Sequence, residues 1–114
     1  MPTSHRDDDR YRIRLSETER VLMVTLLKGR MNKYFLSKQW MFDNREESRM
    51  SSGTIYPAIK RLIAMHLIVE STEEVEKANS GPEYEVTSIG REVLSWELMR
   101  LQDQINLGKE RYRK

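Results

Sequence analysis

Residues 52–62, with the sequence Ser-Gly-Thr-Ile-Tyr-Pro-Ala-Ile-Lys-Arg-Leu, decide the fold class of this chain of 114 residues. Apolar residues recur at the i, i+3, i+4, i+7, i+8 spacing of a helix with one apolar face, at Ile55, Ala58, Ile59, Leu62 and Ile63. The opposite face carries polar and basic groups, at Thr54, Tyr56, Lys60 and Arg61. Such a helix, with small, polar and basic groups on its outer face, is a candidate DNA-reading helix.

Two further helices are predicted before this stretch. The first begins at Ser16, because Glu19 stands three residues later and completes a capping box, and it ends at Gly29. It is apolar nearly all round and should lie at the centre of the core. The second helix is predicted over residues 33–42, with side chains available for burial at Tyr34, Leu36 or Phe35, Trp40 and Met41.

A third helix and a hairpin should follow. The helix covers about residues 52–65, and we expect an irregular first turn because Pro57 lacks an amide hydrogen close to the helix start. Residues 67–69 and 84–86 then have the pattern of two short strands. The long tip between them contains turn-forming residues, at Asn79, Ser80, Gly81 and Pro82.

The last predicted helix runs from residue 87 or 88 to residue 107 and ends at Gly108. One short apolar stripe is suited to covering the core, at Ile89, Val93 and Trp96. A second stripe follows the 4-3-4 spacing of a coiled-coil seam, at Leu94, Leu98, Leu101 and Ile105. The seam predicts a homodimer, although both stripes could instead pack within one chain.

Composition limits the chain to one small domain, with 38% apolar residues. It has no cysteine, and its two histidines lie far apart in the sequence, so we expect no metal and no cofactor. No apolar run approaches the roughly 18 residues of a membrane span, and residues 1–14 lack the apolar core of a signal peptide. A cytoplasmic protein without a membrane partner is expected.

Charge is segregated along the chain, although the net charge is only +2. Residues 28–61 hold eight cations and three acids, whereas residues 70–97 hold eight acids and two cations. Two solvated faces would explain this pattern. It would also suit a protein that presents one basic face to a polyanion such as DNA.

An enzyme is not expected. The sequence contains no nucleophile elbow, phosphate-binding glycine loop or metal cluster, and no histidine–carboxylate pair with usable spacing. Its one glycine-rich context, Ser80-Gly81-Pro82, has the composition of a turn.

Two motifs resemble those of PadR-like transcriptional regulators, a branch of the winged-helix DNA-binding proteins. Residues 52–62 are similar to the recognition-helix signature of that family. Residues 81–91, Gly-Pro-Glu-Tyr-Glu-Val-Thr-Ser-Ile-Gly-Arg, are similar to the strand that leaves the wing and enters a Thr-x-x-Gly motif. The resemblance covers residues 15–107. It implies a mainly α-helical fold with a small β-hairpin (α+β): a winged helix-turn-helix followed by a long C-terminal dimerisation helix.

On this basis the chain divides into four parts. Residues 1–14 form a flexible charged arm, residues 15–87 the winged-helix DNA-binding domain, residues 88–108 the dimerisation helix and residues 109–114 a basic tail. Within the arm, residues 11–15 alternate in polarity and are predicted to extend into a strand.

The resemblance also implies a DNA interface centred on the third helix. In the family this helix enters the major groove and the C-terminal helix contacts a second subunit, which implies a two-fold symmetric operator. The implied DNA-binding residues are Ser52, Gly53, Thr54, Tyr56, Lys60 and Arg61 on the third helix, Tyr34 and Lys38 on the second, and Lys77 in the wing.

Three features depart from the family pattern. The wing has Lys77 as its only cation among five acids, which disfavours close contact with phosphates: Glu73, Glu74, Glu76, Glu83 and Glu85. His66 stands where the family usually has glycine, and it must then adopt the left-handed conformation. Lys33 replaces another glycine and adds a cation close to the expected DNA.

These observations predict a homodimeric, sequence-specific regulator of transcription that binds double-stranded DNA, with repression favoured by the resemblance. Two alternatives remain open. The chain could be a winged-helix module that binds a protein partner through its acidic wing. It could also respond to planar aromatic compounds, because some PadR-like dimers bind them at the subunit interface, where Trp96 and Met99 would line a cavity.

Overall fold

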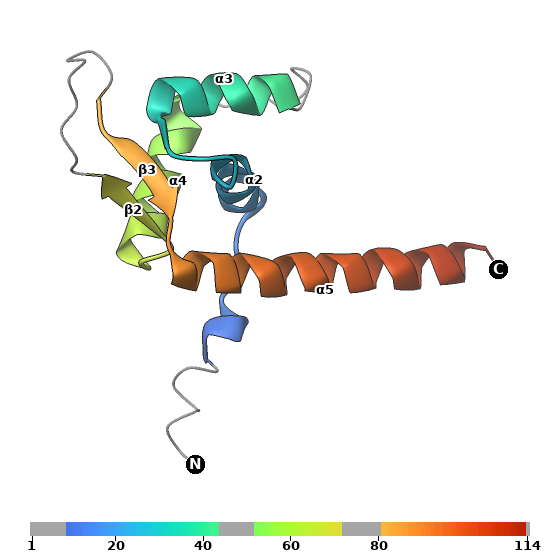
Figure 1. Ribbon diagram of the computed structural model, residues 1–114. Helices are drawn as coiled ribbons and strands as arrows, with labels where there is room; N and C mark the ends of the chain where they lie inside the picture. The colour runs from blue at the N-terminus through green and yellow to red at the C-terminus, as the bar shows by residue number, and fades with distance from the viewer. Residues whose placement is uncertain (1–8, 44–51, 72–80, 114) are drawn as a thin grey trace.

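The computed structural model describes residues 9–43, 52–71 and 81–113 (Figure 1). These ranges contain a short 3-10 helix, four α-helices and three strands. In chain order they are η1 (Asp9–Arg12), α2 (Glu17–Leu26), β1 (Met31–Asn32), α3 (Lys33–Asp43), α4 (Ser52–Ala64), β2 (Ile68–Ser71), β3 (Glu83–Val86) and α5 (Ser88–Tyr112). The predicted α+β fold class is confirmed.

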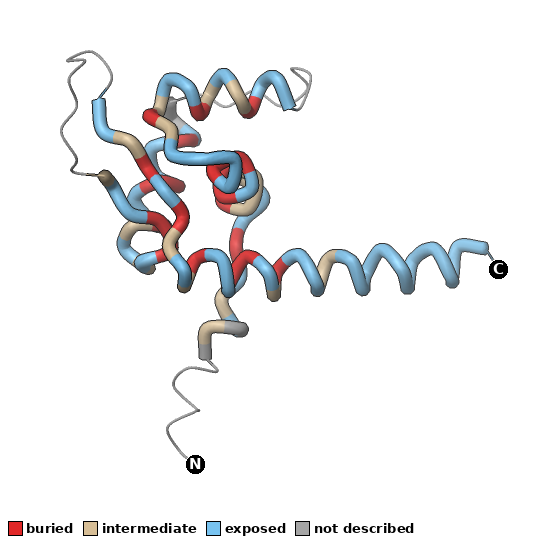
Figure 2. Tube along the Cα trace, viewed as in Figure 1, coloured by how far each residue is buried: buried red, intermediate tan, exposed pale blue. Residues whose placement is uncertain are grey.

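The core lies between α2, α3 and α4 and is closed below by the first half of α5 (Figure 2). The apolar face predicted for α4 is buried, at Ile55, Ala58, Ile59 and Leu62. On α3 the core side is formed by Leu36 and Trp40. The other three side chains considered for burial there, Tyr34, Phe35 and Met41, are exposed.

The sheet has three antiparallel strands in the order β1-β3-β2. The predicted hairpin forms, with Ile68 opposite Val86 and Glu70 opposite Tyr84. Strand β1 was not predicted, because two residues are too few to show an alternating pattern. Its residue Asn32 pairs with Glu83, and the Asn32 side chain also accepts a hydrogen bond from the amide of Phe35 at 2.9 Å. One residue thus ends a strand and caps a helix.

The start of α2 agrees with the sequence. The Ser16 hydroxyl accepts a hydrogen bond from the Glu19 amide at 3.1 Å, and the Glu19 carboxylate accepts one from the Ser16 amide at 2.9 Å. These two bonds are the predicted capping box, and they satisfy amide donors that have no partner inside the helix. The helix proper ends at Leu26, and the following turn reaches Gly29 at a φ of 154°.

Three predictions of local structure were wrong. Residues 11–15 do not form a strand, because η1 occupies Asp9–Arg12 and its backbone closes a turn at Ile13. The first turn of α4 is regular, and Pro57 lies within the helix as its sixth residue. Gly108 does not end the last helix, which continues to Tyr112.

The predicted left-handed conformation of His66 is confirmed, with a φ of 63°. The Leu67 amide donates to the Leu62 carbonyl, and the His66 amide donates to the Ile63 carbonyl. This pair of bonds is a Schellman motif, which satisfies carbonyls left open at the end of α4. It turns the chain directly into β2.

The start of α5 is fixed to the same turn. The Thr87 hydroxyl lies 2.7 Å from the His66 carbonyl oxygen and accepts a hydrogen bond from the Gly90 amide at 2.9 Å. A β-carbon at Gly90 would overlap the backbone carbonyl of Leu67. The Thr-x-x-Gly motif therefore forms a joint, by which we mean the direct contact between the backbone of α5 at Gly90 and the backbone of Leu67.

Replacing Gly90 should break this joint. We expect Gly90→Ala to lower the free energy of unfolding by about 2 kcal/mol, because the added methyl group must push Leu67 away from α5. Urea unfolding at a fixed protein concentration measures the change.

Gly108→Ala is the matched control. A β-carbon there meets no atom within 4 Å, and alanine is the better helix former, so this variant should be more stable by about 0.5–1 kcal/mol. Equal effects of the two substitutions would contradict the close approach at Gly90.

Candidate nucleic-acid interface

The outer face of α4 is the centre of the predicted DNA interface. Tyr56 and Lys60 lie four residues apart and are exposed, and Thr54 is exposed near the start of the helix. Ser52 and Gly53 form the first turn, where the amides have no partner within the helix and can bind an anion. The placement of the Ser52 side chain lies outside the described part of the structure. Tyr56 and Lys60 are thus brought together, whereas Thr54 lies about 160° from Tyr56 around the helix axis.

A lysine of α3 holds the exposed tyrosine of α4. The Lys33 ammonium donates a hydrogen bond to the Tyr56 hydroxyl and lies 3.9 Å from the centre of the Tyr56 ring. Hydrogen bonding and cation–π attraction therefore orient Tyr56 from one side. The sequence identified Lys33 only as an added charge, and its role beside Tyr56 depends on the packing of α3 against α4.

Tyr34 and Lys38 form a second group on the outer face of α3. The Lys38 ammonium lies 5.0 Å from the centre of the Tyr34 ring, and both side chains are exposed. They share a face because they are four residues apart on one helix. Lys77, the predicted wing contact, lies outside the described residues.

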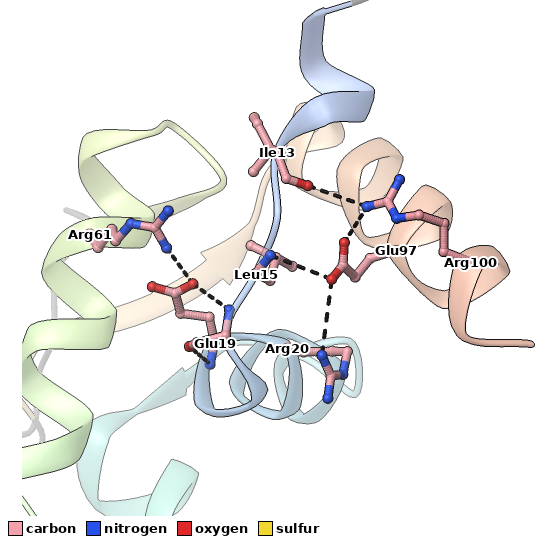
Figure 3. Close-up of polar contacts among 8 residues, drawn as sticks. Ile13, Leu15, Glu19, Arg20, Arg61, Glu97 and Arg100 are labelled. Carbon is pink, nitrogen blue, oxygen red and sulfur yellow. Dashed lines mark hydrogen bonds and ion pairs between the residues drawn. The ribbon is translucent and has the colours of Figure 1, made fainter. Parts of the chain in front are cut away.

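Arg61 is exposed like Lys60, but it has a partner within the protein. Its guanidinium forms an ion pair with Glu19, a residue of α2 that is only 4% exposed (Figure 3). The same carboxylate oxygen accepts the Ser16 amide of the capping box. Arg61 therefore joins α4 to the start of α2, and its charge is largely compensated at the predicted interface.

A second buried carboxylate attaches the N-terminal segment to α5 (Figure 3). Glu97 is 6% exposed, pairs with Arg100 and accepts a hydrogen bond from the Leu15 amide at 3.4 Å. Arg100 also donates to the Ile13 carbonyl at 3.3 Å. No sequence pattern indicated the contacts of Leu15 and Ile13 with α5, because these partners are more than 80 residues apart.

Tyr84 supports the interface from β3. Burial raises the pKa of its phenol, and the nearby Glu70 and Tyr56 raise the pKa further. The phenol therefore stays neutral at physiological pH and adds no negative charge beside Tyr56. The strands around it are nevertheless acidic, with Glu70 and Glu85 exposed and Glu83 partly exposed.

The predicted dimerisation seam is only partly accessible. Leu94 is 2% exposed and belongs to the core of its own chain. The accessible seam consists of Leu98, Leu101 and Ile105, of which Ile105 is 50% exposed. Leu98 also lines a hollow of about 220 Å³ together with Val24 of α2.

Trp96 and Met99, the predicted ligand residues, are half-buried and exposed respectively. At about 100° per residue, Trp96 lies about 160° from Leu98 around the axis of α5. The two side chains are therefore on the side of the helix away from the accessible seam. Among the described residues, no group of three or more histidine, cysteine, aspartate or glutamate side chains is placed to hold a metal ion.

The described helices also include none that is long and apolar enough to cross a membrane.

Comparison of sequences identified no relative: no family model matches the chain, and no curated protein matches it. The fold, in contrast, is shared with solved structures of regulators. A transcriptional regulator from Clostridium thermocellum superposes with a TM-score of 0.71 at 17% identity, over 82% of this chain and 87% of that one. A PadR-like transcription factor from Bacteroides fragilis gives 0.67 at 21% identity over the same shares.

A candidate transcriptional regulator from Thermoplasma acidophilum gives a TM-score of 0.64 at 21% identity, over 85% of this chain and 91% of that one. The chain therefore has the winged-helix fold of PadR-like regulators, as the two sequence motifs predicted.

The Glu97 contacts should make a measurable contribution to stability. We expect Glu97→Ala to lower the free energy of unfolding by about 2–3 kcal/mol, because it removes the acceptor of the buried Leu15 amide and the ion pair with Arg100. Urea unfolding at constant protein concentration measures the loss.

Glu92→Ala provides the comparison on the same helix. Glu92 also pairs with an arginine of the N-terminal segment, Arg10 at 3.1 Å, but its side chain is half exposed. Its loss should cost less than about 0.5 kcal/mol. If both variants behaved alike, the buried position of Glu97 would have no energetic importance.

Proposed function

We propose that this protein is a transcriptional regulator that binds double-stranded DNA in a sequence-specific manner, with α4 as its recognition helix. The observation that carries the proposal is the outer face of α4, where Tyr56 and Lys60 are exposed on a helix that the Arg61–Glu19 ion pair joins to α2. The winged-helix fold supports it, because in this fold such a helix enters the major groove.

The proposed contacts follow from the position of each side chain. Lys60 and Tyr56 reach base edges or phosphates, while Thr54 and the amides of Ser52 and Gly53 bind a phosphate at the helix start. The Tyr34–Lys38 pair on α3 and Lys33 add supporting contacts to the backbone. Lys77 is proposed as the only cationic contact of the wing.

Arg61 has a different proposed role from the one suggested by its sequence position. Because its guanidinium pairs with Glu19, it fixes the angle of α4 on the domain and contributes little charge to DNA. The acidic residues Glu70, Glu83 and Glu85 on β2 and β3 would repel a phosphate backbone. Affinity therefore depends mainly on α3 and α4, and on having two copies of them.

We propose that the second copy is supplied by dimerisation through α5. All of residues 102–112 in this helix are exposed (Figure 2), and Leu98 and Ile105 of the accessible seam are 40% and 50% exposed. An apolar stripe of this kind is stabilised by a matching helix. A two-fold dimer would bind a symmetric operator, and the resemblance to PadR-like proteins favours repression.

DNA binding can be tested at Lys60. Fluorescence anisotropy with a duplex selected from a random library should show affinity five- to ten-fold weaker for Lys60→Ala, with a logarithmic salt slope smaller by about 1. Lys109→Ala, which removes an exposed lysine near the end of α5, should leave both quantities unchanged. Wild-type affinity and slope for the double variant Lys60→Ala/Tyr56→Ala at low salt would rule out α4 as the recognition helix.

Dimerisation can be tested on the accessible seam. Ile105→Lys should raise the dimer dissociation constant at least 100-fold in sedimentation equilibrium, because a lysine ammonium would be placed in the apolar contact. Leu107→Lys is the control, since Leu107 is similarly exposed but lies on the opposite side of α5. Dissociation by both variants, or by neither, would exclude the seam as the dimer contact.

A further inference from the structure

A groove beside α3 has one lining residue, Lys38, in common with the proposed DNA interface. It is a hollow of about 660 Å³ between α3, β1 and the turn after α2. Its walls combine three cations with three apolar side chains, namely Lys28, Arg30, Lys38, Met31, Phe35 and Phe42. We refer to these six residues as the α3 groove.

The aromatic side chains of the α3 groove are unusually exposed. Phe35 is 57% exposed and Phe42 is 77% exposed. They are seven residues apart, and therefore about 10 Å apart along the same side of the helix. Single exposed apolar residues are common on protein surfaces, but two exposed phenylalanines that line one hollow form an apolar surface of the kind that marks a binding site.

Lys38 lies on α3 between the two phenylalanines, and the other two cations lie on neighbouring segments. Arg30 donates a hydrogen bond to the Ser71 hydroxyl at 3.2 Å, which holds its guanidinium at the end of β2. Lys28 is exposed on the turn after α2, and Lys38 is exposed on α3. A ligand that places an apolar side chain on the phenylalanines thus has positive charge on several sides.

We propose that the α3 groove binds an acidic peptide segment of a partner protein, with an aromatic or aliphatic side chain between carboxylates. The apolar side chain would cover Phe35 and Phe42, and the carboxylates would pair with Lys28, Arg30 and Lys38. The groove is open and about two helical turns long, which suits four to six extended residues better than a small enclosed ligand.

The acidic wall of the groove favours a peptide over a nucleic acid. Glu83 lines the groove opposite α3, and Glu85 lies two residues further along β3. A single strand of DNA or RNA carries a phosphate at every nucleotide and would bring some of them near these carboxylates. A peptide can place its few acids only where the cations are.

Apart from Lys38, the groove and the proposed DNA interface lie on different sides of α3. Lys33 contacts Tyr56 of α4, whereas Phe35 is on the side that faces β1 and the groove. A bound peptide therefore leaves the outer face of α4 accessible. The inference goes beyond the proposed function and does not depend on it.

The test begins with a displayed library of random 12-residue peptides selected on the full chain. The strongest peptide is then synthesised with a fluorescent label, together with a version in which every acid is replaced by lysine. We expect selected sequences rich in aspartate and glutamate around an aromatic or aliphatic residue, and no binding by the lysine version. Titration of isotope-labelled protein should shift the amide resonances of Met31, Phe35 and Phe42.

Substitutions on the groove should then weaken peptide binding at least ten-fold, as measured by anisotropy for Phe42→Ser and Lys28→Glu. Both residues are exposed, so the fold is preserved. Met99→Ser and Lys109→Glu change an exposed methionine and an exposed lysine on α5 and should bind the peptide as the wild type does. Duplex affinity, measured in parallel on the selected operator, reports on the proposed function separately.

Several outcomes would overturn the proposal. These are the absence of acidic bias among the selected peptides, equal binding by the lysine version, or shifts confined to α5. Binding of a single-stranded oligothymidylate at the same amides, when no peptide binds there, would identify the groove as a nucleic-acid site. Shifts of the groove amides on concentrating the protein alone would identify a second copy as its occupant.

Discussion

One buried carboxylate fixes the geometry on which the outer face of α4 depends. Glu19 completes the capping box of α2 and at the same time pairs with Arg61 of α4. A carboxylate shielded from water is stable only when charge and hydrogen-bond donors compensate it. The Arg61–Glu19 ion pair therefore fixes the distance between the start of α2 and the last turns of α4. The side chains of Tyr56 and Lys60 are exposed, and Arg61 beside them is half exposed but paired with Glu19.

Much of the fold could be predicted from local patterns. The capping box at Ser16, the apolar face of α4, the paired strands around Ile68 and Val86, and the left-handed His66 all depend on residues within a few positions of one another. Contacts across the chain could not be predicted in this way. Nothing local to Glu97 indicates Leu15 as its partner, and the burial of Leu94 follows from how α5 crosses α2.

The same distinction applies to the candidate interface. The spacing on α4 correctly predicted that Tyr56 and Lys60 are exposed on one side of the helix, whereas Arg61 is exposed but paired with Glu19 of α2. Helical periodicity predicts the direction of a side chain around the helix axis only approximately. A buried acid on another helix then decides whether an exposed arginine is available to a ligand or is paired within the protein. The residue type alone could not separate these two outcomes.

The joint at Thr87 and Gly90 gives α5 the properties of a lever. The helix has 25 residues and is therefore about 37 Å long, so a tilt of about 10° at the joint would move its far end by about 6 Å. At the joint α5 contacts the Leu67 carbonyl, which lies just after the turn that ends α4. In a dimer joined through α5, the stiffness of this single backbone contact would set how far apart the two α4 helices can move, and hence how much variation in half-site spacing one protein can accept.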